Sequence, residues 1–259
     1  MPHSLSFAMT LYIMNIIFED KDILVLSKPA GITVNRSDTT HYEKTLQEWV
    51  EEYLKVPRVS QEEARGTRDT LGTRDTFLSR AGIVHRLDKE TSGVLIIAKN
   101  PSSFENLQAQ FKNRTVKKIY LALVHGIVAP EEGDIRVPVG RLPWNRKRFG
   151  VLAGGRDAIT KYKVLSIKYL GEEPLSLVQL FPETGRTHQI RVHLKHIGHP
   201  IFADFLYAGR KTARNDRKLL GRVFLHASKI SFTNPKTGES ISFEASLPEE
   251  LEKFLKTLV

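Results

Sequence analysis

A polar segment directly before an apolar run holds the densest group of potentially reactive side chains. Residues 82–93, GIVHRLDKETSG, carry basic, acidic and hydroxyl groups, and residues 94–98, VLIIA, follow as a predicted buried strand. Polar loops at the end of a rigid strand are common places for active sites. The same residues suit an ordinary surface turn in which Asp88 and Thr91 accept backbone hydrogen bonds. The residue types alone leave both interpretations open.

A second polar segment, residues 184–194, TGRTHQIRVHL, opens a predicted helix. It begins a cluster of four histidines at His188, His193, His196 and His199. Spacings of five, three and three, without an Asp or Glu among them, match no zinc signature. We therefore expect no metal and assign these side chains to polar packing or nucleic-acid contacts. The chain has no cysteine, which excludes disulfides, thiolate metal sites and a cysteine nucleophile.

The charge balance favours a polyanionic partner. Lys and Arg number 39 against 29 Asp and Glu, for a net charge of +10 among 259 residues. Residues 136–156 hold six basic residues and no acid, with Trp144 and Phe149 among them, and residues 209–222 hold six basic residues against Asp216. Cations contact phosphates and aromatic rings stack on bases, so RNA or DNA is the expected partner, and a charged, solvated face is the alternative.

The periodicity predicts an α+β domain over residues 15–259. We expect two short strands around the turn at 19–22, a helix at 43–55, strands at 94–98 and 119–124, a hairpin at 160–181, and helices at 188–197 and after Pro248. Clustered strands with few intervening helices favour a mixed, largely antiparallel β-sheet with flanking helices.

Two segments are expected to lie outside the core of this domain: an N-terminal extension and an internal insertion. Residues 1–14 are expected to be an N-terminal extension without signal-peptide features, and no run approaches the roughly 20 apolar residues of a membrane span. We therefore expect a cytoplasmic protein without a membrane partner. Residues 57–80 contain the tandem hexamers GTRDTL and GTRDTF and are predicted to be an inserted polar loop.

Five ordered blocks closely resemble the RluA-type pseudouridine synthase family. They span roughly residues 15–250 and include KPAG at 28–31, the segment 82–93, KIY at 118–120, the segment 184–194 with GHPI at 198–201 and Asp204, and LHA at 225–227 with Leu247 and Pro248. The resemblance implies the pseudouridine synthase fold with a central catalytic cleft. No room is expected for the separate N-terminal RNA-binding domain that the family often carries.

The resemblance also implies a reaction and a set of residues. A uridine in ribosomal or transfer RNA would be isomerised to pseudouridine without a cofactor, by a protein expected to be a monomer. Asp88 would be the catalytic carboxylate, Arg186 would keep it ionised, and Tyr120 would pack on the uracil and accept the carbon-5 proton. The expected RNA-binding residues are Arg86, His85, Lys118, Arg141, Arg146, Arg148 and Arg191.

Some alternatives stay open at this point. Arg86 would fill the gap left by the flipped uridine, or would pair with Glu90 as an ordinary loop ion pair. The chain as a whole could instead be a metal-dependent nuclease that uses the histidine cluster, or a non-catalytic RNA-binding protein on the same fold.

Overall fold

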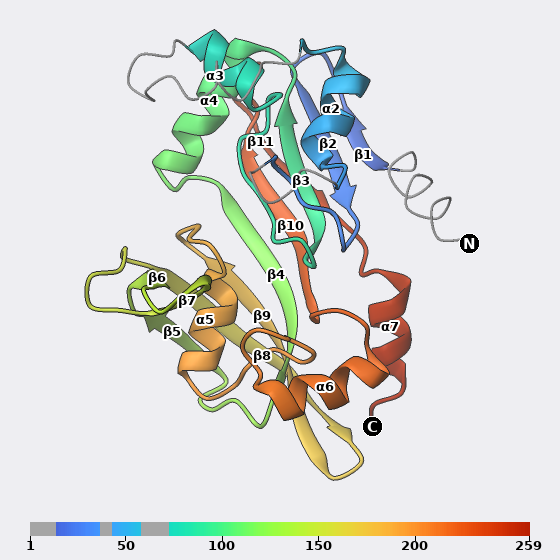
Figure 1. Ribbon diagram of the computed structural model, residues 1–259. Coiled ribbons are helices and arrows are strands. Elements are labelled where there is room, and N and C mark those ends of the chain that lie inside the picture. Colours follow the sequence, from blue (N-terminus) through green and yellow to red (C-terminus); the bar gives the residue numbers. More distant parts are fainter. Residues whose placement is uncertain (1–13, 37–42, 58–72) are drawn as a thin grey trace. The chain divides into compact units, whose positions relative to one another are not determined.

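A computed structural model describes residues 14–36, 43–57 and 73–259, which fold as two compact units (Figure 1). Unit 1 comprises the described residues up to Lys89 together with 93–116 and 230–245. Unit 2 comprises 90–92, 117–229 and 246–259. Of the predicted extension at 1–14, all but Met14 lies outside the described residues.

Unit 1 is built on strands in the order β1-β2-β3-β10, with β11 paired to β10, and the pairs β1–β2 and β2–β3 are antiparallel. The strands are β1 (Asn15–Glu19), β2 (Ile23–Lys28), β3 (Ser92–Ala98), the second half of β10 (Leu225–Thr233) and β11 (Ser240–Glu244). All seven residues of β3 are buried, as the apolar run at 94–98 predicts. The predicted turn between β1 and β2 is confirmed, and the Asp20 carboxylate accepts hydrogen bonds from the amides of Asp22 and Ile23.

Three helices belong to unit 1, namely α2 (Leu46–Leu54), α3 (Thr73–Ser79) and α4 (Pro101–Lys112). Helix α2 begins with a capping box between Thr45 and Glu48, so its start follows from local sequence. Helix α3 corrects the prediction of a polar loop at 57–80. The apolar Phe77 of the second hexamer is buried, with its ring 5.8 Å from that of Phe104 on α4, and this contact gives residues 73–79 a surface to fold against. Residues 58–72 of that prediction lie outside the described residues.

Unit 2 holds the strand order β10-β4-β9-β8-β5 and a separate β6–β7 hairpin. Its strands are the first half of β10, β4 (Lys117–His125), β5 (Glu132–Arg136), β6 (Val139–Leu142), β7 (Asn145–Val151), β8 (Ile159–Leu170) and β9 (Glu173–Pro182). The antiparallel pairing of β8 with β9 confirms the predicted hairpin, with Val164 opposite Val178. The strand pairs β4–β9 and β5–β8 are antiparallel too, which confirms the predicted fold class.

The helices of unit 2 are α5 (Gln189–His196), α6 (Arg210–Leu219) and α7 (Glu249–Lys256). Helix α7 and the residues after it bury Leu251, Phe254 and Leu258 in the same core as Leu123 of β4 and Leu180 of β9. The helices predicted around 188–197 and at the C-terminus are therefore confirmed. No helix within the described ranges is long and apolar enough to cross a membrane.

Candidate active site

The segment that carries Asp88 is clamped by the KPAG block in unit 1. Lys28 at the end of β2 is fully buried, and its ammonium donates to the carbonyls of Pro29 at 2.8 Å, Ile32 at 3.0 Å and Lys89 at 3.2 Å. The amide of Gly31 donates to the same Lys89 carbonyl at 2.8 Å. A buried ammonium must find such acceptors. Two hydrogen bonds therefore fix the residue directly after Asp88.

The other end of the same loop is held against β3 and α4. The His85 ring accepts a hydrogen bond from the amide of Ile96 at 3.0 Å, and it stacks on Phe111 with 4.8 Å between ring centroids. Gly82 has a φ of +73°, and a Cβ there would lie 2.0 Å from the carbonyl oxygen of Ala98, so glycine is required. Between these fixed ends Arg86 is exposed and Asp88 is half-buried.

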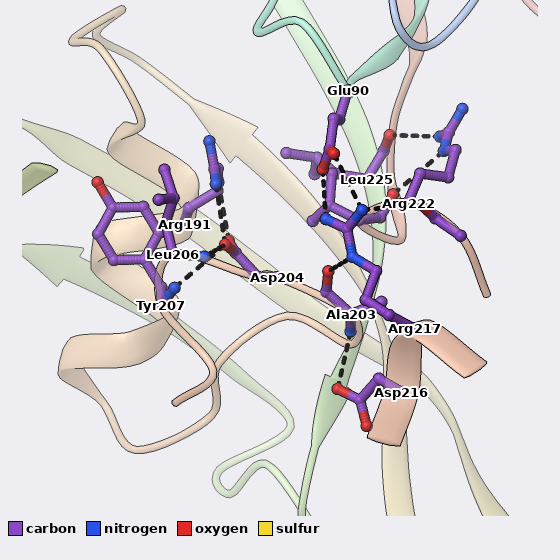
Figure 2. A network of polar contacts seen from close by, with 12 residues as sticks. Glu90, Arg191, Ala203, Asp204, Leu206, Tyr207, Asp216, Arg217, Arg222 and Leu225 are labelled. Atoms are coloured by element: carbon purple, nitrogen blue, oxygen red, sulfur yellow. Dashed lines mark hydrogen bonds and ion pairs between the residues drawn. The ribbon is translucent and has the colours of Figure 1, made fainter. Parts of the chain in front are cut away.

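Residues 90–92 belong to unit 2 and are held by two arginines. The Glu90 carboxylate accepts hydrogen bonds from Nη1 and Nη2 of Arg217, at 3.0 and 2.6 Å (Figure 2). The Ser92 hydroxyl lies 2.9 Å from His226 Nδ1 and accepts a hydrogen bond from Arg222 at 2.8 Å. The ion pair that the described residues show for Glu90 is with Arg217, and the alternative in which Arg86 pairs with Glu90 stays a prediction.

Strand β4 of unit 2 carries two more predicted site residues on one face. Lys118 and Tyr120 are two positions apart, so their side chains lie on the same side of the strand. Both are half-buried, and Tyr120 is paired in register with Leu180 of β9. Burial lowers the pKa of Lys118 to about 8, so this ammonium titrates close to physiological pH.

Arg186 occupies the turn that opens α5 in unit 2. Its amide donates to the Gln189 side-chain oxygen at 3.0 Å, and its Nε donates to the carbonyl of Asp157 at 3.1 Å. The buried Gln189 also accepts from the Thr184 hydroxyl at 2.7 Å, so the turn TGRTHQ is fixed by its own polar side chains. This explains why Thr and Gln flank the arginine in sequence.

Arg191 does not lie at the surface as expected for an RNA-binding residue. It is 7% exposed, and its Nε and Nη2 each donate at 2.8 Å to the carboxylate of Asp204, which is fully buried (Figure 2). The amides of Leu206 and Tyr207 donate to the same carboxylate at 3.0 and 3.2 Å. The prediction that Arg191 contacts RNA is therefore corrected, because its guanidinium is used to hold the turn after Asp204.

The β6–β7 hairpin carries the remaining predicted RNA-binding residues. Arg141 is exposed and lies over the ring of Phe149 on the opposite strand, 5.0 Å from its centroid. Arg148 is half-buried on β7. Arg146 lies on the same strand, and its side chain is outside the described part of the chain.

The histidines near α5 have separate partners. His188 lies 2.8 Å from the Tyr207 hydroxyl, His193 lies 3.2 Å from the Val137 carbonyl, and His199 lies 2.9 Å from the His125 carbonyl. Burial lowers the pKa of His193 to about 4, so its ring is neutral at neutral pH. Within the ranges that the structure describes, no group of three or more His, Asp or Glu residues could hold a metal ion.

The structure thus groups the predicted residues by segment. His85, Arg86 and Asp88 share one clamped loop in unit 1, and unit 2 holds the others on β4, on the β6–β7 hairpin and at the start of α5. Sequence reasoning missed Lys28, Arg217 and Arg222 as residues that hold the loop and its flank. The KPAG block signalled only the first of them, as a lysine at the end of an apolar strand.

The fold is that of pseudouridylate synthase domains. The solved structure "Human RNA Pseudouridylate Synthase Domain Containing 1" aligns with a TM-score of 0.70 and 26% identity, covering 94% of this chain and 88% of that one. The family model described as RNA pseudouridylate synthase matches residues 22–196, which is more than half of the chain. The chain therefore belongs to the RNA pseudouridylate synthase family, which confirms the resemblance.

Two bacterial relatives extend the comparison. "Ribosomal large subunit pseudouridine synthase D" of Neisseria meningitidis serogroup B is 39% identical over 252 residues, which cover 95% of this chain and 61% of that protein. "Uncharacterized RNA pseudouridine synthase YlyB" of Bacillus subtilis is 37% identical over 245 residues, covering 95% of this chain and 73% of that protein. The chain thus spans about three fifths of the Neisseria protein's length.

Proposed function

We propose that this protein is an RNA pseudouridine synthase that isomerises specific uridines in ribosomal or transfer RNA. The observation that carries the proposal is the clamped loop of Asp88 in a chain of this family. The name of the Neisseria relative, a ribosomal large subunit pseudouridine synthase, favours large-subunit ribosomal RNA as the substrate.

The proposed chemistry exchanges one bond at the ribose. The bond between C1′ and N1 of uridine breaks, the uracil rotates, and a bond from C1′ to C5 replaces it. The C5 proton leaves, N1 gains a proton, and no oxidant or cofactor is consumed. The Asp88 carboxylate serves the bond-breaking step, either as the nucleophile at C1′ or as the negative charge that stabilises the sugar cation.

Two further roles follow from the family resemblance. By the family resemblance Arg186 is the arginine of the catalytic reaction, and its Nε bond to the Asp157 carbonyl holds the guanidinium in a defined orientation. Tyr120 packs on the uracil and accepts the C5 proton directly or through water. The side chains that contact the RNA phosphates are those of Lys118, Arg141, Arg146 and Arg148.

Turnover of RNA tritiated at uridine C5 tests the proposal. Asp88→Asn should abolish tritium release and leave RNA affinity within about three-fold, because the amide keeps the shape but can neither attack nor carry the charge. Asp134→Asn is the matched control, since Asp134 is an aspartate of β5 paired with the exposed Arg136. Turnover of Asp88→Asn at even about a tenth of the wild-type rate would remove Asp88 from the mechanism.

The same assay separates the other function classes. A synthase releases tritium without cutting the strand and keeps its activity in excess chelator, whereas a nuclease that uses the histidines would cleave RNA and need added metal. A non-catalytic binding protein would release no tritium. Mapping pseudouridines in cells with and without the gene would identify the RNA and the position.

A further inference from the structure

The local sequence of helix α6 opposes helix formation. Arg210, Arg214 and Lys218 follow one another at i, i+4 spacing, where like charges destabilise a helix. The first turn contains no acid, and Gly209 at the N-cap provides no side-chain cap. Two cations in that first turn also face the positive end of the helix dipole. Something other than the exposed residues must therefore hold this helix.

The inward face of α6 provides the anchors. Asp216 is buried, accepts a hydrogen bond from the Ala203 amide at 3.0 Å, and lies 3.1 Å from His125 Nε2. Arg217 donates to the Ala203 carbonyl at 2.7 Å and to both oxygens of Glu90 (Figure 2). The only acid of α6 is thus used on the inside of unit 2.

The exposed residues of α6 include four cations and no acid, beside Asn215 and Leu219. Arg210, Lys211, Arg214 and Lys218 are exposed, and we call these four side chains the α6 basic face. Within the residues that the structure describes, Arg210, Lys211 and Arg214 form no ion pair with a carboxylate. Exposed like charges one helical turn apart repel one another, and a bound polyanion would relieve that repulsion.

Helix α7 of the same unit shows the ordinary arrangement of exposed charges. Its first turn carries Glu249, Glu250 and Glu252, and Lys253 pairs with Glu249 at 2.6 Å across one helical turn. Those charges compensate one another locally. The comparison shows that the charge pattern of α6 is not a general property of the helices on unit 2.

We propose that the α6 basic face binds the phosphate backbone of the RNA substrate. The inference rests on the proposed function for the identity of the polyanion, and it assigns an RNA-binding surface to a helix outside the blocks that resemble the family. Phosphates spaced along a strand match a row of cations one helical turn apart better than a single anion does. The anchors on Ala203 and Glu90 hold the helix in place, so RNA contacts need not order it.

A matched pair of double variants tests this surface. Arg210→Gln/Arg214→Gln removes two charges from the α6 basic face, and Lys253→Gln/Lys256→Gln removes two exposed charges from α7, so both lower the net charge from +10 to +8. Affinity for a fluorescent single-stranded RNA is measured as a function of salt. Two lost phosphate contacts should reduce the log–log salt slope by about 1.4 and weaken binding about 25-fold at 0.1 M salt. The α7 variant should change affinity less than about three-fold.

Thermal unfolding separates a lost RNA contact from misfolding, and the outcomes distinguish the surface from the proposed function. The α6 variant should unfold at no lower temperature than wild type, because it relieves repulsion, so weaker binding cannot be blamed on misfolding. Equal losses of affinity in the two variants would overturn the α6 basic face as a site. Absence of tritium release by wild type would refute the proposed function instead, while the binding comparison would still decide the surface.

Discussion

Replacing Arg191 with methionine should destabilise unit 2 without removing an RNA contact. The substitution keeps a long apolar side chain and leaves the Asp204 carboxylate fully buried without its two charge-assisted bonds of 2.8 Å. It also removes the cation that lies 5.0 Å from the centroid of the Tyr207 ring. The amides of Leu206 and Tyr207 remain as donors to one carboxylate oxygen.

The expected loss follows from what remains unpaired. Removing one partner of a buried ion pair costs about 3–5 kcal/mol, and the two remaining amide donors place Asp204 at the lower end, at about 3–4 kcal/mol. For a chain of this size the melting temperature should fall by roughly 6–16 °C. Adding Asp204→Asn to Arg191→Met should recover about 1–2 kcal/mol, because the asparagine carbonyl still accepts both amides and the buried charge is gone.

Urea unfolding of the two single variants and the double variant measures these terms, with RNA affinity measured at 25 °C. We expect Arg191→Met to bind RNA within about three-fold of wild type, whereas Arg141→Met on the exposed hairpin should bind less tightly. The argument fails if Arg191→Met loses less than about 1 kcal/mol while its RNA affinity falls tenfold. It fails also if the second substitution lowers stability further, since that would show that no uncompensated charge had been left.

Three other outcomes follow from the structure. Burial alone would lower the pKa of His125, but hydrogen bonds to Asp216 and Glu173 outweigh it and raise the pKa. The protonated His125 ring therefore stabilises the fold fully below the ordinary pKa of 6.5, and this stabilisation is lost as pH rises through the raised pKa. Urea unfolding should show that His125→Gln lowers the free energy of unfolding more at about pH 6 than at about pH 9. The pKa of Lys118, lowered from 10.5 to about 8, predicts that Lys118→Met has its greatest stability advantage below pH 8 and loses it by about pH 10.5; a flat difference between the two unfolding curves would contradict this. In single-turnover assays, Arg86→Met should slow reaction on structured RNA more than on an unstructured RNA, whereas Arg186→Met should slow both equally; equal losses for Arg86→Met would remove its gap-filling role.

Local periodicity sufficed for the elements whose stability comes from an apolar face. The buried run of β3, the hairpin of β8 and β9, and the amphipathic α7 were all predictable from the spacing of their apolar residues. Helix α6 was not, because its charged sequence has no such pattern and its position depends on Asp216 and Arg217 contacts made through the tertiary fold.

The candidate site shows the same limit for single residues. Arg186 and Arg191 look alike in sequence, five positions apart in one polar segment. They differ because Asp204, 13 residues after Arg191, folds back onto one guanidinium and not the other. The burial of Lys28 likewise depends on a carbonyl 61 residues away at Lys89, which no local pattern reveals.

Strand β10 belongs to both units, which affects how the chain folds during synthesis and whether either unit can be expressed alone. Its first half belongs to unit 2 and its second half, from Ile230, belongs to unit 1, while unit 2 resumes at Ser246. During synthesis unit 1 cannot complete its sheet until residues 230–245 have left the ribosome, and unit 2 cannot close its core until Leu251, Phe254 and Leu258 follow. Neither unit can therefore be expressed as one uninterrupted fragment, and a premature stop before residue 230 would leave both without their last core segments.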